Sequence, residues 1–269
     1  MTGPTSRIAR AGLASPARAA IGTSLAGSAL SVLSKAPQHL AHLFHRRFPT
    51  VAVTGMTGVG KTALADRLSR HSPAAGTADV GSAVMEHRTR RSAQGRGFRF
   101  RVVPGDNAAT RLGALDEVFH DEPVDGILHV VAYGHATPRR AGGVTGVAAA
   151  SRERQLAAEL EDWSITAHRI ASMAVRRGKP VWLVIVVTKT DLFPHAIEEA
   201  VRYYSPGGGS PFGDRLDELR ALAGGARLSI DVLPVCTQGG AKGTAMPEKR
   251  CGELLGALET RMAQLSGHL

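Results

Sequence analysis

The sequence has few cysteines, few aromatic residues and no acidic residue in its first quarter. Cys236 and Cys251 are the two cysteines among 269 residues, and their spacing fits neither a disulfide framework nor a zinc motif. This scarcity excludes a disulfide-stapled scaffold and favours a reducing, cytoplasmic setting. Aromatic residues make up 4% of the chain, and no RNA-binding motif accompanies them, which argues against nucleic acid as a partner.

No Asp or Glu precedes Asp66, so residues 1–48 carry six cationic residues without any acidic residue to balance them. Three interpretations stay open: a disordered lead-in, a peripheral membrane anchor through a basic amphipathic helix over 30–44, and an organelle transit peptide. The apolar stretch 19–33 is too short and too rich in glycine and serine to span a bilayer. We therefore separate residues 1–48, a basic extension, from one domain over 49–269.

Lysine is also scarce, with 6 lysines against 27 arginines, yet one lysine lies in a complete phosphate-binding pattern. Residues 55–62 fit G-x-x-x-x-G-K-[ST], in which glycines let backbone N–H groups point at a phosphate. A β-branched segment precedes the pattern, and apolar residues at helical spacing follow it. A phosphate loop requires this order of strand, glycine loop and helix, whereas an ordinary glycine-rich turn does not. Lys61 would contact the outer phosphates, and the Thr62 hydroxyl would bind Mg²⁺. The residues expected at the phosphates are Gly55, Met56, Thr57, Gly58, Val59, Gly60, Lys61 and Thr62.

A second motif follows the apolar run 181–187, which has the composition of a fully buried parallel strand. It reads Thr188-Lys189-Thr190-Asp191 and would lie outside the carboxyl end of that strand, where such sheets bind ligands. Here the chain resembles the P-loop GTPases of the translation-factor-related (TRAFAC) class, whose base-reading motif is Asn/Thr-Lys-x-Asp. The resemblance implies GTP or GDP as ligand: Asp191 would accept hydrogen bonds from guanine, Lys189 would cover the base, and Thr188 would tie this loop to the phosphate loop.

The third motif of that family, Asp-x-x-Gly, is incomplete in this chain. Gly105 matches its glycine, but Val102 stands where the family has the aspartate that holds Mg²⁺ through a water. Asp106 follows at the position where many relatives carry a water-orienting residue, and it is a candidate for Mg²⁺ or for the attacking water. An ordinary turn residue is the alternative for Asp106.

The remaining family motifs match loosely. Cys236 and Thr237 follow the strand-like segment 229–234 and resemble the fifth motif, whose backbone amides contact the base. The threonine of the first switch is not fixed by the sequence. Its candidates are Thr77, Ser82 and Thr89.

Strand-like and helical segments alternate along 50–265, which predicts an α/β fold with a mostly parallel six-stranded sheet between two helical layers. Apolar residues of 151–177 step by three or four and predict one long helix with its stripe in the core. Segment 204–225 reads as an insertion that carries an extra helix. By resemblance, this is the three-layer fold of a P-loop GTPase domain.

Two groups of arginines have competing interpretations. The run over 87–101 predicts a basic hairpin edge that meets an acidic partner or, as the favoured alternative, is a solvated face. Arg111 is a candidate arginine finger acting in cis, with a surface helix arginine as the favoured alternative. The basic run consists of His87, Arg88, Arg90, Arg91, Arg96, Arg99 and Arg101.

Together the motifs predict a GTP-binding protein that hydrolyses GTP slowly with Mg²⁺ and acts as a switch. Segments 71–82 and 104–112 would respond to the γ-phosphate. Lys61 and Asp106 are the catalytic candidates, and Thr62 is the metal-binding candidate. A guanine-binding pseudo-GTPase and a P-loop ATPase are the alternatives. An effector protein, a G-domain homodimer and peripheral membrane contact through the basic extension are the further partners that we expect.

Overall fold

The structure is a computed structural model that describes residues 48–70, 85–91, 97–105, 108–136, 151–238 and 246–267. All of these residues belong to one compact unit, Phe48–Leu269. Residues 1–47 lie outside the described residues, so the expectations for the basic extension stay expectations. No helix of the described part is long and apolar enough to cross a membrane.

The described strands form one six-stranded sheet in the order β2-β3-β1-β4-β5-β6. Every neighbouring pair is parallel except β2 and β3, which form an antiparallel edge. This arrangement confirms the mostly parallel sheet predicted from the alternating segments. The strands are β1 (Thr50–Thr54), β2 (Glu86–Arg91), β3 (Gly97–Val102), β4 (Gly126–Val131), β5 (Val181–Val187) and β6 (Leu228–Pro234).

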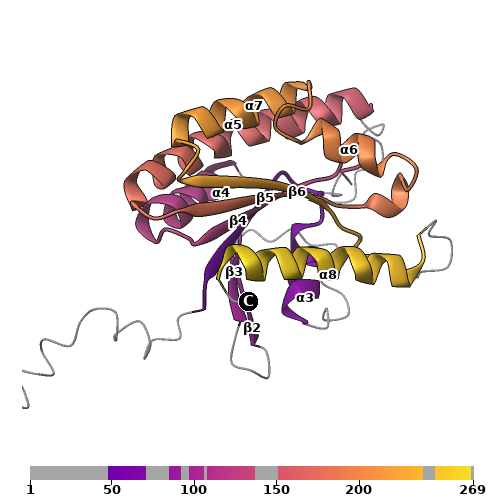
Figure 1. Ribbon diagram of the computed structural model, residues 1–269, viewed down its shortest axis with the longest axis horizontal. Coiled ribbons are helices and arrows are strands. Elements are labelled where there is room, and N and C mark those ends of the chain that lie inside the picture. The colour runs from indigo at the N-terminus through magenta and orange to yellow at the C-terminus, as the bar shows by residue number, and fades with distance from the viewer. Residues whose placement is uncertain are drawn as a thin grey trace, which may run out of the picture. The chain divides into compact units, whose positions relative to one another are not determined.

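Helices cover both faces of the sheet, as Figure 1 shows. One face carries α4, α5, α6 and α7, and the other carries α3 and α8. The interior strand β5 has apolar side chains on both faces: Leu183 packs under α5 and Trp182 packs under α8. The helices are α3 (Lys61–Ser69), α4 (Ala108–Asp116), α5 (Arg152–Arg177), α6 (Ile197–Tyr203), α7 (Pro211–Ala223) and α8 (Glu248–Leu265).

The longest helix, α5, shows why its sequence folds as predicted. Its apolar stripe, which includes Trp163 and Ile170, is buried in the core between this helix layer and the sheet. The Ser151 hydroxyl accepts a hydrogen bond from the N–H of Arg154 and caps the N-terminus. At the other end Gly178 adopts the left-handed conformation with φ 62°, which ends the helix before Pro180.

The bounds of α5, β5 and β6 lie within one residue of the segments 151–177, 181–187 and 229–234 that the sequence predicts. The sequence also predicts a helix over 108–119, whereas α4 ends at Asp116 and continues as a π-helical turn, η1 (Glu117–Asp121). The predicted insertion holds α7, which begins with Pro211 at its first position and Ser210 as its cap. With the glycine loop between β1 and α3, the observed order of elements is the three-layer α/β fold with a mostly parallel sheet that the sequence predicts.

Candidate functional site

The phosphate-loop pattern forms the turn between β1 and α3. Gly55, Gly58 and Gly60 have φ of 128°, 81° and 96°, which side-chain-bearing residues rarely adopt. A Cβ at Gly55 would also overlap the carbonyl oxygen of Val130. These glycines therefore let the loop curl at the N-terminus of α3, where backbone N–H groups and the helix dipole favour an anion.

Lys61, the first residue of α3, folds back over this loop. Its ammonium donates hydrogen bonds to the carbonyl oxygens of Gly55 at 2.8 Å and Met56 at 2.9 Å. Gly105 lies against the same group: a Cβ there would stand 2.9 Å from Lys61 Nζ and 2.6 Å from Thr57 Oγ1. The chain that follows β3 thus approaches the phosphate loop so closely that a side chain at Gly105 would meet it.

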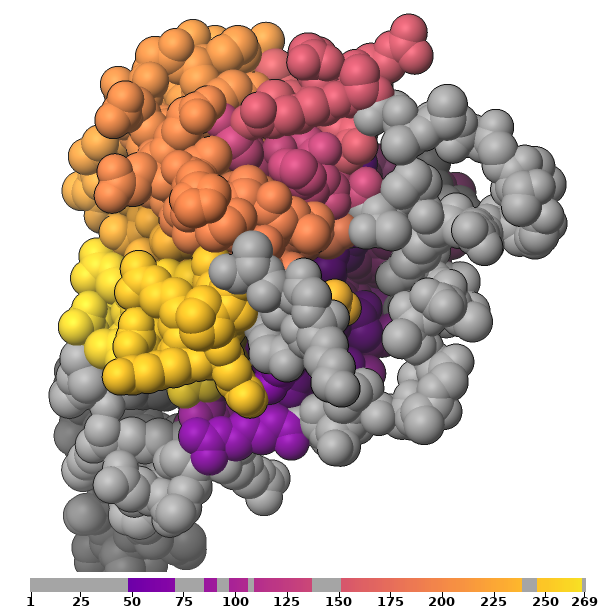
Figure 2. All heavy atoms as spheres, turned by 90° about the vertical axis from the view of Figure 1, so that its right-hand side faces the viewer, coloured from indigo at the N-terminus to yellow at the C-terminus, as the bar shows by residue number. Residues whose placement is uncertain are grey.

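The base-reading motif follows β5 at the same edge of the sheet and is fixed to the phosphate loop. Thr188 is fully buried, and its hydroxyl contacts the carbonyl oxygens of Val59 at 2.6 Å and Val131 at 2.9 Å. This contact is the connection between the two loops that the family resemblance implies. Figure 2 looks onto this side of the molecule, where indigo, orange and yellow segments far apart in the chain come together.

Backbone strain occurs at the carboxyl ends of β4 and β5. Lys189 has φ 57° and Tyr133 has φ 50°, although neither residue is a glycine. Such conformations persist where the surrounding structure holds them, and they gather at functional sites. The Lys189 ammonium donates a hydrogen bond of 2.9 Å to the carbonyl oxygen of His135, which joins the two strained turns.

Asp191 lies beside the loop that follows β6. The Cys236 thiol donates to Asp191 Oδ1 across 3.6 Å. Burial, followed by a hydrogen bond with Cys251, raises the pKa of Cys236 to about 12, so this thiol stays protonated at neutral pH. The adjacent carbonyl oxygen of Thr237 accepts a hydrogen bond from Arg67 of α3, which links this loop to the phosphate side. The structure therefore brings Cys236 and Thr237 to the loop that contains Asp191.

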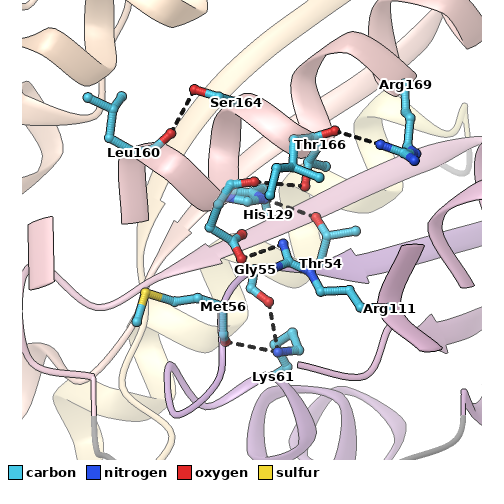
Figure 3. Close-up of polar contacts among 12 residues, drawn as sticks. Thr54, Gly55, Met56, Lys61, Arg111, His129, Leu160, Ser164, Thr166 and Arg169 are labelled. Carbon is cyan, nitrogen blue, oxygen red and sulfur yellow. Dashed lines mark hydrogen bonds and ion pairs between the residues drawn. The ribbon is translucent and has the colours of Figure 1, made fainter. Parts of the chain in front are cut away.

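A buried polar cluster beneath the phosphate loop was not part of the sequence prediction (Figure 3). His129 of β4 is 1% exposed, and its Nδ1 lies 3.0 Å from the hydroxyl of Thr54. Burial, and then the charges of Arg111 and Lys61, lower the pKa of His129 to about 3, so the imidazole is neutral.

Arg111 of α4 contributes to the same cluster and corrects a prediction. Its guanidinium forms an ion pair with Asp162 of α5, and the two side chains are 13% and 4% exposed. The favoured expectation of a surface arginine is therefore wrong, because a carboxylate from a helix 51 positions away in sequence takes the guanidinium into the interior.

Part of the expected basic hairpin face is also corrected. Arg88 pairs with Asp66 at 3.0 Å and Arg90 pairs with Glu259 at 2.6 Å. Arg101 is 8% exposed and is paired with acidic residues around η1. These three arginines are neutralised by acidic residues from distant elements, so they do not form an open basic surface.

Several residues that the sequence analysis named as candidates lie outside the described part of the chain, and one first-switch candidate lies in a strand rather than in a loop. Asp106, Thr77, Ser82 and Arg96 lie outside the described residues. Thr89 is exposed in the middle of β2 and pairs with Arg99.

Val102, at the position of the family's aspartate, is 3% exposed and packs in the apolar cluster under α3 and α8.

One acidic residue at this edge was missed by the sequence analysis. Glu159 is 1% exposed and accepts a hydrogen bond of 2.9 Å from the N–H of Ala132 and another from the hydroxyl of Tyr204. Burial raises the pKa of its carboxyl. Glu159 and Asp162 fall at three- to four-residue steps from Trp163 and Thr166, on the apolar face of α5, and that spacing was the available signal.

Comparison with known proteins yields a weak structural likeness only. No family model matches the chain, and no curated protein matches it. A GTP-binding protein from the archaeon Sulfolobus solfataricus, solved in complex with GDP, superposes with a TM-score of 0.44 at 14% identity over 93% of this chain and 61% of its own. Two mutation variants of SsGBP give TM-scores of 0.42 at 15% and 14% identity, over 82% and 83% of this chain. The chain spans 57% to 61% of the length of these structures.

Proposed function

We propose that this protein binds a guanine nucleotide at the carboxyl edge of the sheet. The phosphates would occupy loop 55–60, and the base would lie against 188–191. The observation that carries this proposal is the Thr188 hydroxyl on the Val59 carbonyl oxygen, because it fixes the two loops relative to each other. A ligand that fits both loops would have phosphates at one end. At the other end it would have a base whose N–H groups donate hydrogen bonds to Asp191.

The proposed reaction is slow hydrolysis of GTP in a regulatory switch. Lys61 would leave the carbonyl oxygens of Gly55 and Met56 and stabilise the charge on the outer phosphates. Loss of the γ-phosphate would release segments 71–82 and 104–112 and change the surface offered to an effector protein. Asp106 is our candidate for orienting the attacking water.

The residues that would hold Mg²⁺ are few. Thr62 offers a half-buried hydroxyl at the first turn of α3. No group of three histidine, cysteine, aspartate or glutamate side chains that could hold a metal occurs among the described residues. Thr62 and the nucleotide itself would hold Mg²⁺, which would neutralise charge on the phosphates, and Asp106, the other candidate, lies outside the described residues.

The second candidate function is a guanine-binding module without turnover, and Val102 favours it. The family's aspartate would be replaced here by an apolar side chain buried in the core. In Val102→Asp, a restored carboxylate should raise phosphate release if the missing group is what limits turnover. Val102→Asn is the matched control, because it has nearly the same shape and polarity without the charge. Equal rates in the wild type and both variants would count against this explanation.

The guanine proposal is tested by Asp191→Asn. An asparagine amide offers a donor where the carboxylate accepts, so the variant should prefer xanthine nucleotides over guanine nucleotides. We expect GDP affinity to fall about 100-fold, since two hydrogen bonds to a charged group are lost. Asp214→Asn, an exposed residue of α7, is the control and should change neither affinity. An ATP-binding protein would keep its base preference in both variants.

A further inference from the structure

The ion pair between Arg111 and Asp162 lies at the foot of the phosphate loop. Figure 3 draws the Arg111 guanidinium beside Gly55, with Lys61 on the other side of that residue. The charges of Arg111 and Lys61 both act on the Asp162 carboxyl, where they oppose the rise in pKa caused by burial. Two cations from different elements therefore converge on the start of one loop.

The ion pair between Arg111 and Asp162 has few of the additional hydrogen bonds expected of a buried ion pair that serves stability alone. Apart from their contact with each other, Nε and Nη2 of Arg111 and both carboxylate oxygens of Asp162 are buried without a hydrogen-bond partner among the described residues. A buried ion pair repays the cost of desolvation only when further hydrogen bonds complete it. The same two helices are joined elsewhere by Arg169 and Asp116 at 2.7 Å. Fastening α4 to α5 therefore does not account for this arginine.

The position of Arg111 in the chain connects it to the phosphates. Gly105 lies against Lys61 and Thr57 of the loop, and Arg111 is six residues further on, in α4. A terminal phosphate held by Lys61 would therefore stand next to the segment that carries Arg111. The guanidinium presents a planar fork of donors that matches phosphate oxygens and binds them in pairs.

We propose that Arg111 is a second phosphate-binding cation, which Asp162 holds in place until a nucleoside triphosphate takes it over. This inference rests on the proposed function. The exchange replaces a carboxylate by a terminal phosphate as the partner of the guanidinium. Because a diphosphate lacks that phosphate, Arg111 then favours the triphosphate over the diphosphate. Asp162 is a positioning residue, since it acts through Arg111.

The test compares affinities of the full chain for GDP and for a non-hydrolysable GTP analogue. Arg111→Gln should weaken analogue binding about 10- to 100-fold and leave GDP binding within about twofold, as expected for a lost charged hydrogen bond. Asp162→Asn should strengthen analogue binding about threefold or more, because the competing carboxylate charge is gone. The matched control is Arg169→Gln, which breaks the other ion pair between the same helices and should change neither affinity.

Folding is controlled by the double variant Arg111→Gln/Asp162→Asn, which removes both charges and leaves no buried ion alone. It should show the same selective loss of analogue affinity even if Arg111→Gln alone does not fold. Equal weakening of GDP and analogue, or the same loss in Arg169→Gln, would overturn the inference and leave guanine binding intact. If the wild type binds neither nucleotide, the proposed function itself fails.

Discussion

The hydroxyl of Thr188 donates a hydrogen bond of 2.6 Å to the carbonyl oxygen of Val59, which lies 129 residues earlier in the chain. A second contact, to Val131 at 2.9 Å, holds the same hydroxyl against β4. One buried side chain thus joins the loops after β1 and β5 and the end of the strand between them. In the proposed function, this junction would set the distance between the phosphates and the base of the bound nucleotide.

Thr188→Val should weaken guanine nucleotide binding while keeping the shape of the side chain. Loss of the hydroxyl leaves the Val59 carbonyl oxygen without this donor, which costs about 1–3 kcal/mol. If this cost destabilises the nucleotide-bound state alone, affinity falls roughly 5- to 150-fold. Thr188→Ser keeps the donor and should bind within a few-fold of the wild type. Titration with fluorescent GDP measures both. An unchanged GDP affinity in Thr188→Val would show that the hydrogen bond between Thr188 and Val59 is not needed for nucleotide binding.

Gly105→Ala should displace Lys61, the lysine that we propose contacts the phosphates. The new Cβ would stand 2.9 Å from Lys61 Nζ and 2.6 Å from Thr57 Oγ1, closer than carbon packs against either atom. We expect at least a tenfold loss of nucleotide affinity with little loss of stability, because the lysine end can move aside. Gly113→Ala in α4, where a Cβ meets nothing within 4 Å, is the control. Similar affinities of the two variants would show that Gly105 is not at the phosphates.

The buried imidazole of His129 predicts acid sensitivity. Its folded-state pKa of about 3 lies below the ordinary 6.5, so the unfolded state binds the extra proton as the pH falls between these values. This group should remove roughly 2 kcal/mol from the free energy of unfolding between pH 7 and pH 5. Burial raises the pKa values of Asp162 and Glu159, which act in the opposite direction, so the comparison must be made by difference.

Denaturation of the wild type and of His129→Gln across pH 4.5 to 7.5 makes that comparison. Glutamine keeps a polar partner for Thr54 and does not titrate. The stability difference between the two proteins should narrow as the pH falls. A difference that stays constant would mean that the imidazole is not held neutral.

The Cys236 thiol should be unreactive and should support Asp191 as a hydrogen-bond donor. With a pKa of about 12, only about one thiol in 10,000 is ionised at pH 8. In Cys251→Ser, where Cys236 is the remaining thiol, alkylation of the native chain should be at least 100-fold slower than after unfolding. Rapid alkylation of the native chain would contradict a buried, protonated Cys236 thiol. Cys236→Ser should keep guanine affinity better than Cys236→Ala.

The fold and the two loops could be predicted from the sequence because the residue patterns that encode them are local. Phosphate binding needs glycines, a lysine and a threonine at fixed spacing, and the continuous apolar run of β5 reflects burial on two faces. Arg111 and the hairpin arginines were misplaced because their acidic partners come from distant helices, as Glu259 does for Arg90. A local pattern of charges does not record such pairs.

Guanine nucleotide binding is the central claim, and one titration tests it most directly. Fluorescent GDP, GTP and ATP analogues are added to the purified full chain with and without Mg²⁺, and phosphate release is followed with GTP. We predict binding of both guanine nucleotides, at least 100-fold weaker binding of ATP, and slow release of phosphate. Binding of ATP as tight as that of GTP would contradict the account, because Asp191 would then not read the base.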